Sequence, residues 1–356
     1  MGAGMPAGPS NHLSRATALD AAGRHDDAIN ELALGTGAGD ADCTDALGIR
    51  LLTGDRAPHL PAEGLGFIGE ACAKGQGAGA ARAAAIVAMG AAGAPDWRAG
   101  LDWLRRSAEA GWQIAQRQLL ALCDDRDLAH RAAASRTASW RMVALAVQLD
   151  RWRHAPPAQV KSAEPRVSAF DAMVPPALCE FFISLAVGRL EPARVYDPVA
   201  RQDIVVAHRN NTIANFDLRT VQFAHVLLQS RMAAACGVSE RQMEAPSVLH
   251  YAPGEQIADH YDFVDPKSTT DYAGEIARNG QRLFTFLIYL NDDYEGGETS
   301  FPRLGFSHRG TLGGGLYFIN ALADMSPDLR MLHAGCPILR GEKWIITQFV
   351  RSRPMR

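Results

Sequence analysis

The chain changes composition about midway, and this change limits the folds that its 356 residues can adopt. Residues 71–95 contain twelve alanines and five glycines, whereas the last hundred residues are rich in phenylalanine, tyrosine, isoleucine and threonine. Alanine favours helices, and aromatic and β-branched residues favour strands. At roughly 150 residues per domain, the length suggests two domains. We therefore expect a helical domain followed by a sheet-containing domain.

The first half carries an internal repeat. At an offset of 36 residues, Gly64 aligns with Gly100 and Gly75 aligns with Gly111. Such a period, with small residues at helix crossings, is typical of stacked helical hairpins. The unit around Gly100 resembles tetratricopeptide-like repeats of the SEL type, and a plain alanine-rich bundle is the alternative. Either interpretation predicts that residues 12–125 are a scaffold or a partner-binding surface.

Three prolines interrupt the helical pattern between His154 and Arg166. The residue before a proline is pushed towards extended backbone, so helices rarely continue through such a stretch. We place a helical and proline-rich linker at residues 126–163 and the second domain at residues 164–356.

The second domain is expected to begin with a strand at VSAFDAMV, to continue with two helices and to end with a run of strands. Helices are predicted at 175–190 and 218–237, the latter ended by a glycine. From residue 246 the chain has short aromatic and β-branched segments separated by turn residues, which predict strands. They are SVLHYA, QIADHYDF, RLFTFLIYL, GLYFIN and KWIITQFV. Helices followed by strands with no helix between them predict an α+β fold with an antiparallel sandwich or barrel.

Charge and composition exclude several classes of protein. A net charge of -3 supplies no broad cationic field for nucleic acid. Hydrophobic residues at 47% and charged residues at 21% argue against a membrane protein. The first ten residues lack the basic and apolar regions of an export signal, so we expect a cytoplasmic protein. The six cysteines lie far apart, which indicates neither a zinc site nor a disulfide framework.

A candidate metal site lies in one of the predicted strands. His260 and Asp262 are two residues apart, so their side chains project from the same face of a strand. The similar pair His25 and Asp27 lies in a helical pattern, where such residues point apart. His333 precedes the final strand and is the candidate for a second histidine. Two histidines and one carboxylate suit Fe(II) and leave positions open for oxygen and a bidentate cosubstrate.

Lysine is rare in this chain, which makes Lys343 informative. Only four of the 36 basic residues are lysines, and Lys343 starts the otherwise apolar strand KWIITQFV. A compact ammonium on a flexible stem fits a narrow barrel and can pair with a carboxylate there. A lysine exposed at a strand end is the alternative.

These stretches together resemble the 2-oxoglutarate and Fe(II)-dependent oxygenases of the prolyl 4-hydroxylase family. The matching segments run in the family's order over about 190 residues: LHYAPGEQIADHYDF, GQRLFTFLIYLND, EGGETSFP, HAGCP and GEKW. The resemblance implies a double-stranded β-helix, or jelly-roll barrel, with flanking helices. It also implies Fe(II), 2-oxoglutarate and O2 as cofactor and cosubstrates, with ascorbate as a further candidate.

The resemblance assigns roles to individual residues. His260, Asp262 and His333 would be the iron ligands and the catalytic centre. Lys343 would bind the 5-carboxylate of 2-oxoglutarate, assisted by hydroxyls of Tyr251 and Thr299. A core tyrosine is the alternative for Tyr251, and Tyr289 is assigned to the core.

The substrate side departs from the family pattern. Arg282 matches an arginine that the family places near the substrate cleft. Ile257 and Phe349 stand where the family often has an aromatic residue and a tryptophan, and Arg351 stands where it often has a histidine. The resemblance therefore predicts the reaction more firmly than the substrate.

We expect a dioxygenase that hydroxylates a C–H bond and releases succinate and CO2. A protein or peptide side chain such as proline is the expected substrate, recruited by the helical repeats. The alternatives are a free amino acid or small metabolite as substrate, or an inactive repeat scaffold or sensor. No nucleic-acid or membrane partner is expected.

Overall fold

The computed structural model describes residues 11–135, 137–197, 202–204, 209–267, 269 and 271–355. The chain divides into two compact units. The first comprises residues 1–149 and 219–226, and the second comprises residues 150–218 and 227–356. The domain boundaries that we predicted from the sequence remain a prediction.

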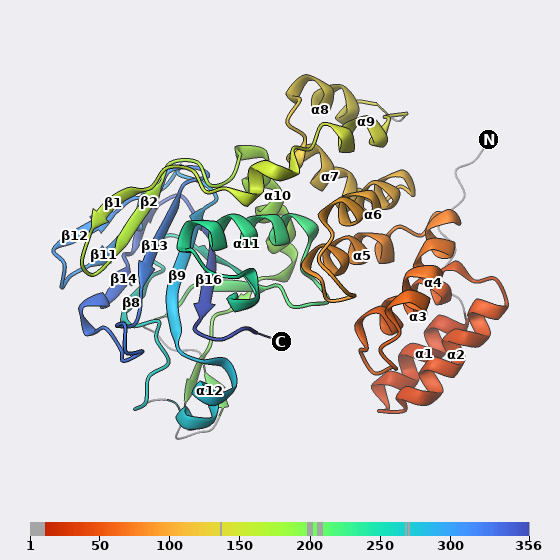
Figure 1. Ribbon diagram of the computed structural model, residues 1–356, viewed down its shortest axis with the longest axis horizontal. Helices are drawn as coiled ribbons and strands as arrows, with labels where there is room; N and C mark the ends of the chain where they lie inside the picture. Colours follow the sequence, from red (N-terminus) through yellow and green to blue (C-terminus); the bar gives the residue numbers. More distant parts are fainter. Residues whose placement is uncertain are drawn as a thin grey trace. The chain divides into compact units, whose positions relative to one another are not determined.

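The first unit is helical, as expected (Figure 1). Its helices are α1 (Asn11–Ala21), α2 (His25–Gly37), α3 (Ala41–Thr53), α4 (Pro61–Ala73), α5 (Ala78–Met89), α6 (Trp97–Glu109), α7 (Gln113–Leu122), α8 (Arg126–Ala133) and α9 (Trp140–Leu145). Neighbours in sequence pack together, with α1 on α2, α3 on α4, and α5 on α6. The repeat interpretation remains a prediction.

Small residues let these helices approach closely. A Cβ on Gly64 of α4 would lie 2.6 Å from the backbone nitrogen of Leu52 in α3, and a Cβ on Gly48 would lie 2.9 Å from the carbonyl oxygen of Gly64. Neither glycine can be replaced at this crossing without moving a helix. The glycines and alanines of the first half therefore set the spacing of its helices.

The second unit contains two main sheets. Its strands are β1 (Gln159–Ser162), β2 (Val167–Phe170), β3 (Glu191–Pro192), β4 (Val195–Asp197), β5 (Gln202–Ile204), β6 (Thr212–Asn215), β7 (Ser247–Tyr251), β8 (Ile257–His260), β9 (Arg282–Tyr289), β10 (Glu295–Gly296), β11 (Thr299–Phe301), β12 (Phe306–His308), β13 (Gly315–Ile319), β14 (His333–Gly335), β15 (Ile338–Arg340) and β16 (Lys343–Arg351). Helices α10 (Pro176–Ala186), α11 (Phe223–Cys236) and α12 (Tyr272–Asn279) and 3-10 turns at Leu149–Arg153, Val187–Arg189, Glu240–Gln242 and Leu329–Met331 complete the described elements.

The strand order identifies the barrel as a jelly roll. The larger sheet has the order β1-β2-β13-β9-β16-β7-β6-β3, and the smaller has the order β12-β11-β14-β8. From β7 onward the chain alternates between them: β7, β9, β13 and β16 lie in the larger sheet, whereas β8, β11, β12 and β14 lie in the smaller. This alternation is the double-stranded β-helix that the family resemblance implied, and the predicted α+β fold class is confirmed.

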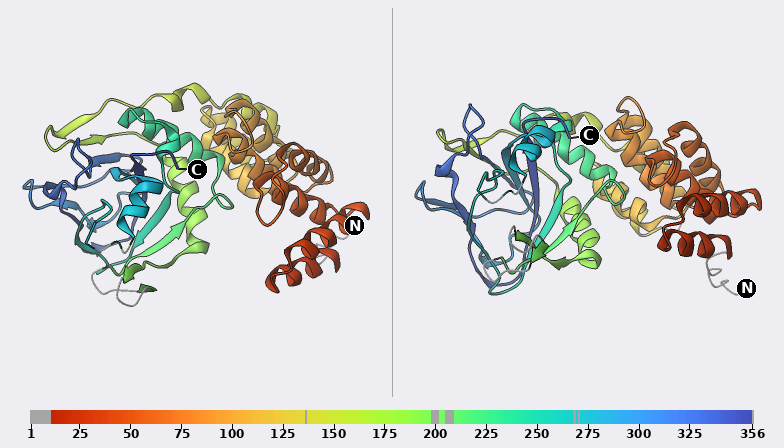
Figure 2. Two further views of the ribbon diagram at one scale, coloured as in Figure 1. Left: turned by 60° about the horizontal axis from the view of Figure 1, so that its bottom comes forward. Right: turned by 90° about the horizontal axis from the view of Figure 1, so that it is seen from below.

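An apolar core fills the space between the two sheets. Phe301 of the smaller sheet packs edge to face on Phe318 of the larger one, with ring centroids 5.2 Å apart. Leu287, Tyr289 and Ile345 belong to the same buried cluster. Figure 2 shows the cyan and blue strands of the second unit that carry these residues.

One helix was missed by the sequence interpretation, which expected no helix among the strands. Helix α12 lies between β8 and β9, and Asp271 caps its first turn by accepting a hydrogen bond from the backbone of Gly274. With only eight residues, about two turns, it is too short for helical periodicity to distinguish it from the loop between two strands.

The cysteines and the hydrophobicity of the helices were also the subject of predictions. The six cysteines are free, and four of them are buried, as expected for small apolar side chains. Among the described helices, none combines the length and hydrophobicity that crossing a membrane would require.

Candidate active site

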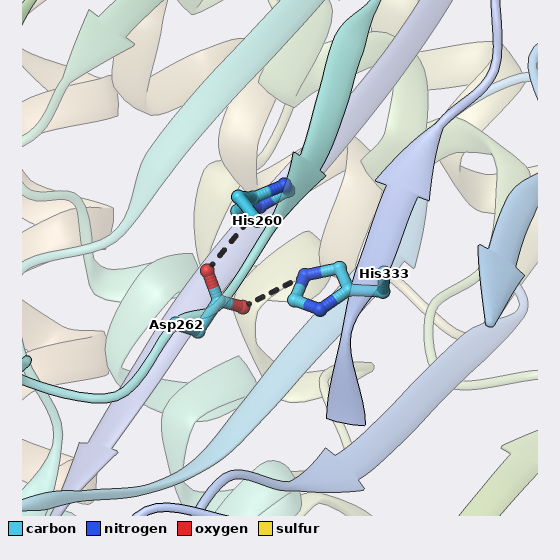
Figure 3. A group of neighbouring side chains, drawn as sticks. All are labelled: His260, Asp262 and His333. Carbon is cyan, nitrogen blue, oxygen red and sulfur yellow. Dashed lines mark ion pairs between the residues drawn. The ribbon is translucent and has the colours of Figure 1, made fainter. Parts of the chain in front are cut away.

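Three predicted metal ligands converge between the sheets (Figure 3). His260 ends β8 and His333 starts β14, and the two residues are paired directly across these antiparallel strands. Asp262 follows two residues after His260. Its carboxylate oxygens lie 3.5 Å from Nε2 of His260 and 3.3 Å from Nε2 of His333. One potential ligand atom from each residue lies within 4.8 Å of the others.

Backbone carbonyls orient both imidazoles. Nδ1 of His260 donates to the carbonyl oxygen of Ala258 at 2.8 Å, and Nδ1 of His333 donates to that of Met331 at 3.0 Å. A proton on Nδ1 leaves Nε2 of each neutral ring with a free lone pair, which is the form that binds a metal. Both Nε2 atoms face Asp262, so all three donors are directed at one point.

Asp262 is held as a carboxylate. Burial favours its neutral form, yet His333 and His260, when protonated in the metal-free protein, hold the pKa of Asp262 well below its ordinary value. Thr285 donates to one carboxylate oxygen at 2.6 Å, and Asn320 donates to the hydroxyl of Thr285 at 2.9 Å. All three side chains are buried. This chain of hydrogen bonds fixes the carboxylate in the orientation that a metal ligand needs.

The backbone after Asp262 is fixed by Gln281, which immediately precedes β9. The Gln281 amide oxygen accepts a hydrogen bond from the backbone N–H of Val264 at 2.6 Å, and its amide nitrogen donates to the carbonyl oxygen of Val264 at 3.1 Å. Gln281 is buried, and its side-chain amide supplies the two hydrogen bonds that Val264 would otherwise form with a neighbouring strand. The sequence interpretation did not identify Gln281.

Lys343 lies at the start of β16 and is 2% exposed. Its ammonium donates to the carbonyl oxygen of Gly297 at 2.6 Å and has no carboxylate partner among the described residues. The nitrogen lies 5.4 Å from the ring centroid of Tyr251 and 5.6 Å from that of Tyr289. Burial lowers the pKa of Lys343 to about 8. A buried ammonium with unused donors is a site for an anion.

Three hydroxyl-bearing side chains lie around this lysine. Tyr251 pairs with Lys343 across β7 and β16, and the hydroxyls of Tyr289 and Thr299 lie 3.0 Å apart in a hydrogen bond. All are buried. The sequence interpretation assigned Tyr289 to the core. The alternation of β9 could have identified it, because Thr285, which binds Asp262, and Tyr289 are four residues apart and share one strand face.

Arg282 and Arg351 are both engaged by carboxylates. Arg282 donates to both carboxylate oxygens of Glu244, at 2.7 and 2.9 Å, and its guanidinium lies 3.7 Å from the ring centroid of Phe349. Arg351 also donates to Glu244, and it lies 2.8 Å from Glu275 of α12. Burial would raise the pKa of Glu244, but these two arginines lower it. The predicted substrate-side arginines thus form one partly buried ionic cluster, in which Arg351 is the buried member.

Ile257, where the family often has an aromatic residue, packs against the core of the barrel. It pairs with Gly335 across β8 and β14, and a Cβ on Gly335 would lie 2.9 Å from its side chain. The contact between Ile257 and Gly335 is therefore close and apolar.

The residues fit the two groups that the resemblance implies. Two imidazole nitrogens and a carboxylate oxygen are donors that suit Fe(II) with positions left open. The buried Lys343 ammonium fits one carboxylate of a dicarboxylic acid. Comparison with known proteins agrees, since residues 246–351 match the model of the 2OG-Fe(II) oxygenase superfamily.

Residues 246–351 form a 2OG-Fe(II) oxygenase domain. The protein is a 2-oxoglutarate-dependent dioxygenase, and its family requires Fe(II), 2-oxoglutarate and O2. The predicted family is therefore confirmed, whereas ascorbate remains a prediction.

Curated relatives include prolyl 4-hydroxylases. Prolyl 4-hydroxylase 1 of Arabidopsis thaliana is 29% identical over 211 residues, which cover 55% of this chain and 72% of the relative. Probable prolyl 4-hydroxylase 3 of the same plant is 29% identical over 235 residues, covering 60% and 77%. Prolyl 4-hydroxylase subunit alpha-1 of Rattus norvegicus is 28% identical over 193 residues, covering 53% and 35%.

Among solved structures, the viral collagen prolyl hydroxylase of Paramecium Bursaria Chlorella virus-1 is 22% identical. The similarity covers 52% of this chain and 96% of the viral one, with a TM-score of 0.40.

Proposed function

We propose that this dioxygenase hydroxylates prolyl residues of a protein or peptide and releases succinate and CO2. The observation that carries the proposal is the convergence of His260, Asp262 and His333 in the same barrel as a buried lysine that has no carboxylate partner among the described residues. The names of the curated relatives support proline as the residue that is hydroxylated.

We assign the metal to the three converging side chains. His260, Asp262 and His333 would hold Fe(II), and Thr285 and Asn320 would keep the carboxylate in place. When bound, the iron supplies the activation of O2 that oxidation of a C–H bond requires. The protein contributes orientation and a dry, apolar barrel around the reacting atoms.

We assign the far carboxylate of 2-oxoglutarate to Lys343. Its ammonium would form a charge-assisted hydrogen bond with that carboxylate, and the hydroxyls of Tyr251, Tyr289 and Thr299 would complete its surroundings. Because the Lys343 ammonium alone would bind this carboxylate, the protein can hold a dianionic cosubstrate although its net charge is near zero.

Arg282 and Arg351 are proposed to act on the substrate side through Glu244. Because both guanidinium groups already bind this carboxylate, they position Glu244 and leave few donors of their own for a peptide. A protein substrate would then meet a rigid ionic cluster at the ends of β9 and β16.

We further propose that the helical unit recruits the protein substrate. Large apolar side chains are exposed on it, among them Leu34 at 61% and Leu145 at 71%. Replacing each by aspartate should raise KM for a protein substrate and leave 2-oxoglutarate turnover without substrate unchanged. Equal KM values for wild type and variants would contradict recruitment by these positions.

A cytoplasmic location also remains a proposal, which fractionation of cells can test.

The test of the reaction is a succinate-release screen with Fe(II), 2-oxoglutarate and ascorbate. Proline-containing peptides, free amino acids and cell lysate fractions would be compared, with mass spectrometry to locate the added oxygen. Hydroxylated peptidyl proline and equimolar succinate are expected, and both should be lost in His260→Ala and Asp262→Ala. Hydroxylation of free amino acids alone would contradict the peptide substrate, and iron-dependent succinate formation in either variant would contradict the ligand assignment.

A further inference from the structure

His308 lies on the inner face of the barrel, next to the pocket assigned to 2-oxoglutarate. It ends β12, where it pairs directly with Thr299 of β11. Residues paired directly across antiparallel strands share one face of the sheet, so His308 and Thr299 point the same way. Thr299 is buried and bonded to Tyr289. Phe306, two residues before His308, packs into the barrel core, which agrees with the inward direction.

Contacts with Tyr289 link His308 to Lys343. The ring centroid of His308 lies 5.7 Å from that of Tyr289, and the Lys343 ammonium lies 5.6 Å from the same centroid. A Cβ on Gly310 would lie 2.0 Å from Cγ of Tyr289, so the backbone after His308 presses against this ring. The imidazole is therefore held near the lysine by the packing of one tyrosine.

The electrostatic surroundings keep this imidazole neutral. Burial, together with the positive charges of Lys161 and Lys343, lowers the pKa of His308 to about 4. A neutral imidazole has one N–H donor and one acceptor. The structure gives its ring nitrogens no hydrogen bond to any described residue. A half-buried donor without a partner beside a buried cation is suited to an anionic ligand.

We propose that His308 is a further binding residue for 2-oxoglutarate, donating a hydrogen bond to the carboxylate that pairs with Lys343. This inference rests on the proposed function, because it assumes that the pocket at Lys343 takes the far carboxylate of the cosubstrate. His308 thus adds an imidazole to the ammonium and hydroxyls of this pocket. The pocket then selects a dicarboxylic acid over a 2-oxo acid that lacks the second carboxylate.

The experiment is a calorimetric titration of the Mn(II)-loaded, full-length protein. The ligands are 2-oxoglutarate and 2-oxovalerate, which lacks the far carboxylate. His308→Val should weaken 2-oxoglutarate binding about tenfold or more, the scale of a lost hydrogen bond to a charged group, and leave 2-oxovalerate binding unchanged. His308→Gln, which keeps a donor, should stay within about threefold of wild type. Ser307→Ala, an exposed position on the same strand, is the matched control and should bind normally.

Several outcomes would overturn the inference. Binding of 2-oxoglutarate by His308→Val within twofold of wild type would do so, and so would equal weakening of both ligands, which indicates a structural role. If the valine variant does not fold, histidine ¹⁵N spectra of the Zn(II)-loaded wild type provide the test, with the His308 signal assigned from His308→Gln. This signal should shift with 2-oxoglutarate and not with 2-oxovalerate, and the absence of such a shift contradicts the inference.

The same titration separates this inference from the proposed function. A wild-type protein that does not bind 2-oxoglutarate would contradict the proposed function itself. A wild-type protein that binds it, with Lys343→Met defective and His308→Val normal, would contradict only the role of His308.

Discussion

Each unit of the molecule buries an ionisable side chain that has no ion pair among the described residues, and the two groups are satisfied differently. In the helical unit both carboxylate oxygens of Asp45 accept hydrogen bonds from the backbone N–H of Gly79, at 3.1 and 3.0 Å, in the first turn of α5. In the barrel unit the Lys343 ammonium has three donors and, among the described residues, one hydrogen-bond partner, the carbonyl oxygen of Gly297. Burial of a charge therefore does not by itself mark a binding site, whereas buried donors left unused do.

The largest expected effect comes from removing the charge of Lys343. Lys343→Met should weaken 2-oxoglutarate binding by about two to three orders of magnitude, because it removes a buried partner of a carboxylate. It should also stabilise the protein at pH 7 by about 3 kcal/mol, since a charge with a pKa lowered from 10.5 to about 8 is no longer buried. Titration of the ligand and urea unfolding measure the two effects. A variant that loses both affinity and stability would contradict the assignment of the lysine to a ligand.

Asp45 should affect stability without affecting the cosubstrate. Burial raises its pKa to about 7, so the folded protein binds more protons than the unfolded one between about pH 4 and pH 7. Stability should therefore fall by about 4 kcal/mol as pH rises through this window. Asp45→Asn should remove this pH dependence and leave 2-oxoglutarate affinity unchanged, as urea unfolding at several pH values and titration would show. A changed affinity would contradict the contrast between the two buried charges.

Alkaline pH should weaken cosubstrate binding through Lys343. Its pKa of about 8 lies below the unfolded value, so the free protein loses the pocket's charge above pH 8. Affinity for 2-oxoglutarate should then fall about tenfold per pH unit. Lys343→Arg keeps its charge at all these pH values, so its weaker affinity should stay flat between pH 7 and pH 10. A parallel decline in both proteins would assign the effect to another group.

The smallest expected effect concerns Gln281. Gln281→Ala should weaken metal binding about tenfold, because the backbone beyond Asp262 loses two hydrogen bonds and the ligand is less well oriented. Titration of Mn(II) into the apoprotein measures this effect. Gln159→Ala, at an exposed position on β1, is the matched control. Wild-type metal affinity in Gln281→Ala would show that Thr285 and Asn320 alone orient Asp262.

The sequence predicted the parts of the site that short-range geometry determines. His260 and Asp262 follow from the two-residue period of a strand, and Lys343 was identified because lysine is rare in this chain. Gln281 and His308 were not identified, because their positions depend on pairing between distant segments that no local pattern reveals. Helix α12 was missed because its eight residues are too few for a helical period to be recognised between two strands. The jelly-roll order followed from resemblance to a family and not from periodicity.

The central claim is that three ligands and one lysine together hold Fe(II) and 2-oxoglutarate, and an anaerobic titration tests it most directly. The Fe(II)-loaded wild type should bind one equivalent of 2-oxoglutarate, Asp262→Ala should bind neither group, and Lys343→Met should keep the metal and lose the cosubstrate. Tight binding of 2-oxoglutarate by the Lys343→Met variant, or of Fe(II) by the Asp262→Ala variant, would contradict the account.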